Sequence, residues 1–254
     1  MSELIIRADD LGYSAGVNFA IYRSVDRGII NNVGTMSNMP LAAEGLQLLK
    51  QSRICLGLHG NISAGSPVSS PDSVPSLVTG SHFHASKEYR EAKEDLVDLV
   101  DPDDAKREIS AQIGRFTDLT GQLPAYVDVH AILSSNFYVG ARAAAKAFNV
   151  PYVETDLNNP VKLGNRTLQL VVQSGTPGYD PLSLLRAQAQ HPDDGVTPFI
   201  VFHPGYLDHY LMTHSSLTTP RTLEAAMLTS LDAKLILAQN HIQLLRLDDV
   251  AAGA

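Results

Sequence analysis

The chain has 254 residues, of which 44% are hydrophobic and 18% charged, so it can bury a large core and general disorder is excluded. Its formal net charge of −8 argues against nucleic acid as a partner, because phosphate binding requires a basic face. No apolar run approaches the roughly 20 residues of a membrane span, and the N-terminus lacks a signal-peptide pattern. Since Cys55 is the single cysteine, no disulfide can form within the chain. We therefore expect a cytoplasmic protein without membrane contact.

Apolar runs and helical patterns alternate from the start of the chain. Residues 4–6 predict a buried strand, and residues 15–27 predict a helix with Val17, Ile21 and Val25 on one face. The runs "VGTM" and "ICLGLH" predict the next two strands. Residues 60–86 are rich in Ser, Pro and Gly, and we expect a long loop there that serves as a lid or rim.

The second half of the chain continues the alternation. Residues 101–119 predict a helix, because "DPDD" offers an N-cap, a proline in the first turn and acidic residues at the positive end of the helix dipole. Strands are predicted at "YVDVH", "PYVE", "FIVFH" and "IQLL", helices at 135–148 and 221–239, and a short strand or hairpin within 156–180. This order predicts an α/β fold with a mostly parallel sheet in a single domain, residues 1–254.

Polar side chains close several predicted strands at their carboxyl ends. They are Asp9 and Asp10, His59, Asp128 and His130, and His203. In parallel α/β folds this edge of the sheet is where active sites form. Carboxylate and imidazole ligands together suit Zn, Co, Ni, Mn or Fe with open positions for water and substrate. A bound cation would also explain two adjacent aspartates, which otherwise repel each other.

Each of these residues also has a simpler explanation. A histidine at a strand end is commonly a hydrogen-bonded structural residue, a "DD" pair before a helix can be an N-cap, and "HPG" can be a turn. The other histidines, including His82 and His84 in the long loop, have no supporting context. The strand-end residues taken together favour a metal-dependent hydrolase as a hypothesis.

Five stretches resemble the YdjC/ChbG family of carbohydrate deacetylases, in the family's order and over nearly the whole chain. They are "IIRADDLGYSAGVNFAI", "LGLHGNIS", "GQLPAYVDVH", "FHPGYLD" and "PRTLEAAMLTS". The resemblance implies a distorted, TIM-like (β/α) barrel with fewer than eight regular strands. It also implies metal-dependent removal of N-acetyl groups from sugars such as chitooligosaccharides.

The resemblance assigns roles to the strand-end residues. Asp10, His59 and His130 would hold one divalent metal ion, which could be Mg, Zn, Co, Ni or Mn. Asp9 would be the general base and His203 the general acid. The expected partner is a small N-acetylated carbohydrate, and a homodimer is compatible with an enzyme of this kind.

Three further residues are expected beside the metal. Asp128 could hold a histidine in one tautomer, a common role for a carboxylate behind a metal ligand. Arg221 and Glu224 of "PRTLE" match a family pattern near the site, where they would form an oriented ion pair or contact the sugar.

The third stretch departs from the family pattern, which reads close to H-x-D-S-H-x-H-x-H. The residues that differ are Tyr126, Val129, Ile132 and Ser134, and Glu154 stands near the place of an expected arginine. The metal site could remain intact while the substrate pocket changes. Two alternatives therefore stay open: a catalytically silent sugar-binding or regulatory relative, and another metal-dependent sugar enzyme such as an isomerase or lyase.

Overall fold

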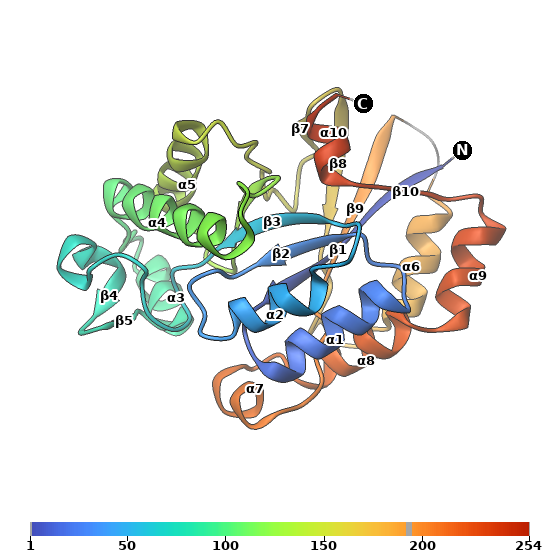
Figure 1. Ribbon diagram of the computed structural model, residues 1–254, viewed down its shortest axis with the longest axis horizontal. Helices are drawn as coiled ribbons and strands as arrows, with labels where there is room; N and C mark the ends of the chain where they lie inside the picture. Colours follow the sequence, from blue (N-terminus) through green and yellow to red (C-terminus); the bar gives the residue numbers. More distant parts are fainter. Residues whose placement is uncertain (1, 192–194, 254) are drawn as a thin grey trace.

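The computed structural model, which describes residues 2–191 and 195–253, has a curled sheet covered by helices (Figure 1). The strand order is β6-β3-β2-β1-β9-β8-β7, and β10 pairs with the start of β1. All pairings in this sheet are parallel except that of β7 with β8. The strands are β1 Glu3–Leu11, β2 Asn32–Thr35, β3 Cys55–Gly60, β6 Val127–Val129, β7 Val161–Leu163, β8 Arg166–Val171, β9 Val196–Phe202 and β10 Gln243–Leu245.

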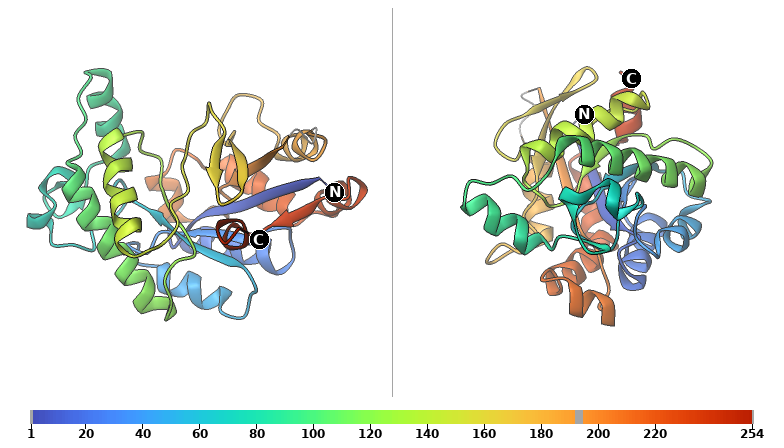
Figure 2. Two further views of the ribbon diagram at one scale, coloured as in Figure 1. Left: turned by 90° about the horizontal axis from the view of Figure 1, so that it is seen from above. Right: turned by 90° about the vertical axis from the view of Figure 1, so that its left-hand side faces the viewer.

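Over the described residues, β6 and β7 end the sheet without pairing with each other, so the barrel is open. This arrangement confirms the predicted α/β class and the distorted, barrel-like sheet. The views in Figure 2 show how strongly the strands twist across the molecule.

Helices cover the outer face of the curled sheet in two adjoining cores. One core lies between β1, β2 and β9 and the helices α1, α2, α6, α8 and α9, and the other lies between β3, β6, α4 and α5. A third core lies on the opposite face, where residues of β1, β8, β9 and β10 pack against α10. The helices are α1 Ala15–Asp26, α2 Ala42–Leu49, α3 Ser86–Glu94, α4 Pro102–Thr120, α5 Ser135–Ala147, α6 Pro181–Ala189, α7 His209–His214, α8 Thr219–Leu228, α9 Leu231–Gln239 and α10 Leu247–Ala251. None of those described is long and apolar enough to cross a membrane.

Local hydrogen bonds explain why the predicted helices begin where they do. Asp101 accepts hydrogen bonds from the amides of Asp103 and Asp104, and Pro102 opens α4, as "DPDD" predicts. Ser134 likewise caps α5 by accepting from the amide of Phe137. These helices confirm the predictions for residues 101–119 and 135–148 to within one residue at either end.

Two expectations need correction. The single helix predicted over residues 221–239 is two helices, because Ser230 leaves the helical conformation and caps α9 through the amide of Ala233. The run "PYVE" makes only an isolated bridge between Val127 and Tyr152 and forms no strand. Proline cannot donate to a sheet ladder, and Pro151 stands at the start of that run.

The long stretch over residues 60–86 is partly ordered. It contains two short 3₁₀ turns, Pro71–Ser73 and Pro75–Leu77, and a two-stranded hairpin of β4 Val78–Thr79 and β5 His82–Phe83.

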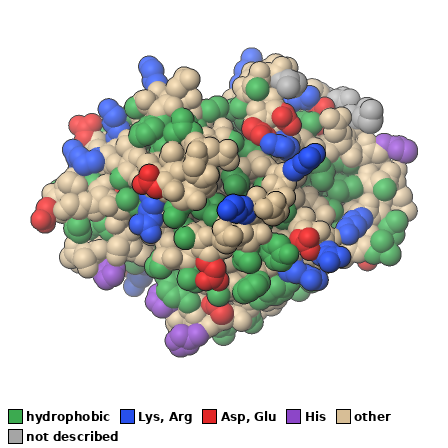
Figure 3. All heavy atoms as spheres, viewed as in Figure 1, with side chains coloured by type: hydrophobic (Ala, Val, Ile, Leu, Met, Phe, Trp, Pro, Cys, Tyr) green, Lys and Arg blue, Asp and Glu red, His purple; other side chains and the backbone are tan. Residues whose placement is uncertain are grey.

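Acidic and basic side chains are interspersed on the face of the molecule drawn in Figure 3, and neither sign forms a large region there.

Candidate metal centre

The two adjacent aspartates of β1 face the same centre because the strand is irregular between them. In a regular strand, neighbouring side chains point to opposite faces of the sheet. Asp10 has φ 76°, and the register with β2 shifts between Ala8 and Leu11. As a result Asp9 Oδ2 and Asp10 Oδ1 each lie 3.7 Å from His59 Nε2. Aspartate tolerates the left-handed region better than most residues, and such conformations are concentrated at functional sites.

Asp10, His59 and His130 form a compact triangle of potential ligand atoms. Asp10 Oδ1 lies 3.1 Å from His130 Nδ1 and 3.7 Å from His59 Nε2, and the two imidazole nitrogens are 3.2 Å apart. Ligands about 2.0–2.2 Å from a tetrahedral metal lie about 3.3–3.6 Å from one another. The triangle therefore has the dimensions of three ligands around one divalent cation.

The polar environment of Asp10 provides a second test of this fit. Asp10 is fully buried, and within the described part of the chain no donor meets its Oδ1 in hydrogen-bond geometry. A buried carboxylate oxygen without a donor is costly unless a cation stands beside it. The donor set of two imidazoles and one carboxylate thus fits a divalent metal ion.

A carboxylate, Asp128, lies behind His59. Asp128 Oδ1 lies 2.9 Å from His59 Nδ1, and both residues are almost fully buried. If Nδ1 carries the proton that this contact requires, Nε2 presents its lone pair to the triangle. Of the candidate ligands, His59 is therefore the histidine that Asp128 contacts.

Arg7 lies beneath this pair and was not predicted. Its Nη2 atom is 2.6 Å from Asp9 Oδ2 and 2.5 Å from Asp128 Oδ2. The guanidinium carbon also lies 4.9 Å from the centre of the Phe199 ring and 5.5 Å from that of Tyr126. Arg7 is 2% exposed, so its single positive charge is shared by two carboxylates inside the protein. Only its position before "ADD" could have suggested this role.

Arg221 and Glu224 both reach the candidate site from α8, but they do not pair with each other in any contact described. Arg221 Nη2 lies 2.6 Å from Asp10 Oδ2, and its Nη1 donates to the backbone carbonyl of His203. Glu224 Oε2 accepts a hydrogen bond of 2.5 Å from the backbone amide of His203. Each residue therefore holds a different part of the site in place.

Burial and neighbouring charges shift the pKa values at the centre. Burial alone would raise the pKa of Asp10, but Arg221 and His130 outweigh it and hold that pKa well below its usual value. Burial would lower the pKa of His59, whereas Asp9 and Asp128 raise it to about 9. Burial, assisted by Arg221 and opposed by Asp10, lowers the pKa of His203.

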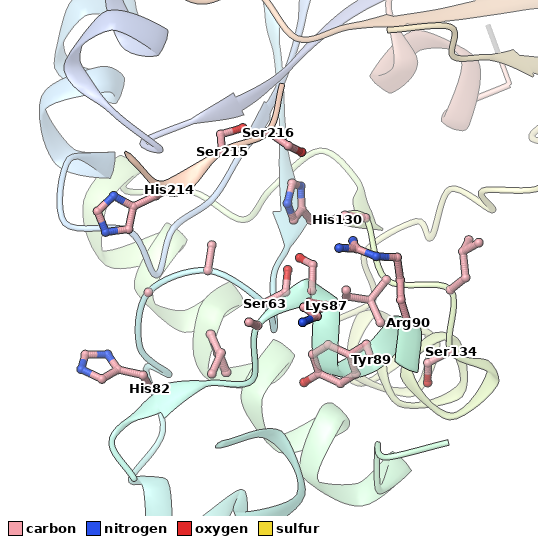
Figure 4. Close-up of a pocket in the computed structure, with 18 of the residues that line it drawn as sticks. Ser63, His82, Lys87, Tyr89, Arg90, His130, Ser134, His214, Ser215 and Ser216 are labelled. Atoms are coloured by element: carbon pink, nitrogen blue, oxygen red, sulfur yellow. The ribbon is translucent and has the colours of Figure 1, made fainter. Parts of the chain in front are cut away.

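The triangle lies at the end of a cavity of about 1410 Å³. Asp10, His130, His203 and Arg221 line it, whereas Asp9 and His59 lie behind these residues and are at most 4% exposed. Figure 4 shows His130 at one side and the α3 residues Lys87, Tyr89 and Arg90 at another. The long stretch over residues 60–86 contributes Ser63–Ser66, His82 and Phe83, so it forms a rim of this cavity.

The residues that depart from the family pattern lie in different places, and Val129 packs in the core between the sheet, α4 and α5. Tyr126 is buried against Arg7 and stands over Gly57, where a Cβ atom would lie 2.1 Å from the tyrosine ring. Ile132 and Ser134 line the cavity, and the Ser134 hydroxyl donates to Asp98.

Glu154 lies elsewhere. It forms a two-point ion pair with Arg142 at the surface, at 2.8 Å for each hydrogen bond, and it does not line the cavity. A change of charge at residue 154 therefore does not alter the cavity wall directly.

Comparisons with known proteins agree with this architecture. Carbohydrate deacetylases from Thermoanaerobacter pseudethanolicus and Brevibacillus brevis are each 29% identical to this chain, covering 96% and 98% of it and 97% and 99% of their own lengths. A crystal structure of an Enterococcus faecalis protein, suggested to act in cellobiose-phosphate cleavage, superposes with a TM-score of 0.79 at 23% identity. That structure covers 98% of this chain and 99% of its own, and it shows the same fold. A family model described as YdjC-like protein matches residues 3–239, and the chain therefore belongs to the YdjC-like family.

Proposed function

We propose that this protein is a metal-dependent carbohydrate deacetylase that hydrolyses the N-acetyl group of an amino sugar or short oligosaccharide. The observation that carries the proposal is the triangle of Asp10, His59 and His130 at the end of a large cavity, flanked by Asp9 and His203. The relatives named carbohydrate deacetylase, which align over almost the whole chain, support the same activity.

The metal ion is proposed from the donor set. Two imidazoles and one carboxylate suit Zn, Co, Ni or Mn better than Mg, which prefers oxygen ligands. When bound, such an ion polarises the acetyl carbonyl and lowers the pKa of water. Asp128 would keep the Nδ1 proton on His59, and Arg221 would keep Asp10 from rotating away.

The proton transfers are assigned to Asp9 and His203. The Asp9 carboxylate accepts the proton of the attacking water, whose oxygen forms the new bond to the acetyl carbon. The C–N bond then breaks with its electron pair going to nitrogen. The imidazolium form of His203, which is the minor form at neutral pH because its pKa is lowered, supplies that nitrogen with a proton from Nε2 and returns to the neutral form. Arg7 would hold the Asp9 carboxylate in place for its step.

The decisive experiment measures acetate release from N-acetylated mono- to trisaccharides, with Zn, Co, Ni, Mn or Mg added after treatment with a chelator. We expect acetate only when metal is present. Asp9→Asn should bind metal at the wild-type ratio and lose about 10²–10⁴-fold in kcat, the usual contribution of a general base. Asp118→Asn, which changes an exposed aspartate of α4, is the matched control and should keep full activity.

Two results would contradict parts of this proposal. Loss of metal binding in Asp9→Asn would overturn the division of roles between Asp9 and Asp10. Absence of acetate from every sugar, with metal bound at one ion per chain, would favour the isomerase, lyase or sugar-binding alternatives. The altered residues Tyr126, Ile132 and Ser134 are the feature that keeps those alternatives in view.

A further inference from the structure

His203 is held by a hydrogen-bonded chain that sequence analysis did not predict. Its Nδ1 atom lies 3.3 Å from the hydroxyl oxygen of Ser174, and the Ser174 hydroxyl in turn donates to Glu224 Oε1. Tyr179 donates to the same Glu224 oxygen at 2.7 Å. Ser174 and Tyr179 both lie between β8 and α6, within residues 156–180, where the sequence predicts a short strand or hairpin.

The number of available protons determines which group donates and which accepts in each of these hydrogen bonds. A carboxylate only accepts hydrogen bonds, and a serine hydroxyl has one proton to donate. Since Ser174 donates to Glu224, it can only accept at its contact with His203. His203 must then carry a proton on Nδ1, which leaves Nε2 as the nitrogen that can face the cavity.

The burial of Glu224 makes the arrangement firm. Glu224 is fully buried and accepts from three donors: the Ser174 hydroxyl, the Tyr179 hydroxyl and the backbone amide of His203. A buried carboxylate needs such donors to offset its loss of hydration. Two of these contacts lead to His203, one through its backbone and one through Ser174.

We propose that Ser174 is a positioning residue, which fixes the tautomer and ring orientation of His203 by linking Nδ1 to Glu224. In a catalytic triad, a carboxylate orients the histidine by direct contact. Here the Ser174 hydroxyl lies between the Glu224 carboxylate and His203. The effect on turnover rests on the proposed deacetylation, whereas the effect on the tautomer does not.

The first arm of the test is NMR of the histidine side chains in the full chain supplied with diamagnetic Zn²⁺. Long-range ¹H–¹⁵N spectra distinguish the two neutral tautomers, and a His203→Gln variant assigns the His203 signal. We expect the Nδ1–H form in the wild type and a mixture containing Nε2–H in Ser174→Ala. The same tautomer in both proteins would overturn the proposal, whether or not the protein releases acetate.

The second arm measures kcat and KM for acetate release. We expect Ser174→Ala to lower kcat about 10–100-fold, a share of the contribution of an acid catalyst, with KM within about twofold. Ser174→Thr keeps the hydroxyl and should restore most of kcat. An active wild type with unchanged kcat in Ser174→Ala would overturn the proposal, and an inactive wild type would instead contradict the proposed function.

Tyr179→Phe is the matched control for the hydrogen bonds that link His203, Ser174 and Glu224. It removes a hydrogen bond from the same Glu224 oxygen without touching His203. We expect the His203 tautomer to stay Nδ1–H and kcat to fall less than in Ser174→Ala. Equal effects of both variants on the tautomer would mean that any weakening of Glu224 disturbs His203, and the specific role of Ser174 would be wrong.

Discussion

Arg7 is the residue on which the two inner carboxylates of the site depend. Its guanidinium lies between Asp9 and Asp128 and has almost no contact with solvent. Removing one partner of a buried ion pair leaves an uncompensated charge, which costs about 3–5 kcal/mol. We therefore expect Arg7→Ala to lower the free energy of unfolding by about that amount in urea titrations.

Arg142→Ala is the control for Arg7→Ala. It breaks a two-point ion pair with Glu154, but both side chains are more than one-third exposed, at 49% and 39%. Pairs of this kind contribute about 0–1 kcal/mol because water screens them. Equal losses of stability in the two variants would contradict the role assigned to Arg7.

Cys55 provides a prediction about pH. Burial and the nearby Asp248 carboxylate raise the pKa of its thiol to about 12 from a usual value of 9.0. The folded protein thus holds this proton more tightly than the unfolded chain. The associated stability is complete below pH 9 and declines as the pH rises toward 12.

Thiol chemistry tests this expectation directly. At pH 8 a thiol reagent such as Ellman's reagent should find no reactive thiol in the folded protein and one per chain in denaturant. Rapid reaction of the folded protein at pH 8 would show that the thiol is accessible and the prediction wrong.

For single residues, the sequence indicates which side chains come together at the candidate site better than it indicates which other side chains contact them. Asp10, His59 and His130 could be predicted to converge because each stands at the carboxyl end of a parallel strand. Arg7 and Ser174 could not, because their roles depend on contacts across the sheet. Ser174 meets Glu224 over a separation of 50 residues, and no local pattern encodes that contact.

Among the structural elements, β3 and α4 each contain a glycine whose replacement has a different consequence. A Cβ atom at Gly57 of β3 would lie 2.1 Å from the Tyr126 ring, whereas one at Gly114 of α4 would meet nothing within 4 Å. Gly57→Ala should destabilise the protein by about 1–3 kcal/mol through overpacking. Gly114→Ala should stabilise it by about 0.5–1 kcal/mol, because alanine loses less backbone entropy in a helix.

Thermal unfolding of the two alanine variants checks both signs in one experiment. A stabilising Gly57→Ala would show that Tyr126 has room to move, and that the close contact is not a constraint on the site. A destabilising Gly114→Ala would show that α4 is packed at that position.

The elements differed in how well they could be predicted. The helix α4 was evident from its N-cap, its first-turn proline and its acidic residues, all of which act within one turn. The break between α8 and α9 was missed because the apolar pattern continues through Ser230. The strand at "PYVE" was predicted from propensity, yet only Tyr152 found a partner on β6.

For the whole molecule, a metal that binds only the folded state must stabilise it. An ion at about 100 times its dissociation constant adds about 2.7 kcal/mol to the free energy of unfolding. We expect added Zn²⁺ to raise the melting temperature of chelator-treated protein, and His130→Ala to abolish that gain. An equal gain in His130→Ala would place the responsible ion elsewhere.

The class of the fold could be predicted at this scale, but the arrangement of the strands could not. Alternating strands and helices indicated a mostly parallel sheet. The order of the strands, with β9 beside β1 and β10 beside the start of β1, depends on long-range pairing. The periodicity of apolar residues along the chain does not indicate which strands pair with each other in the sheet.

The segment that follows the rim residues Ser63–Ser66, residues 68–76, is attached to one helix, α4. Glu108 of α4 accepts hydrogen bonds of 2.9 Å from the backbone amides of Val68 and Ser69, and Asp104 accepts one of 3.0 Å from that of Ser76. These contacts hold this segment by its backbone and make few demands on its side chains. The segment can therefore change in sequence while Asp10 of β1, His59 of β3 and His130 after β6 stay fixed. Under the proposed function, selectivity for the sugar and affinity for the metal would then be separate heritable traits, open to independent selection or engineering.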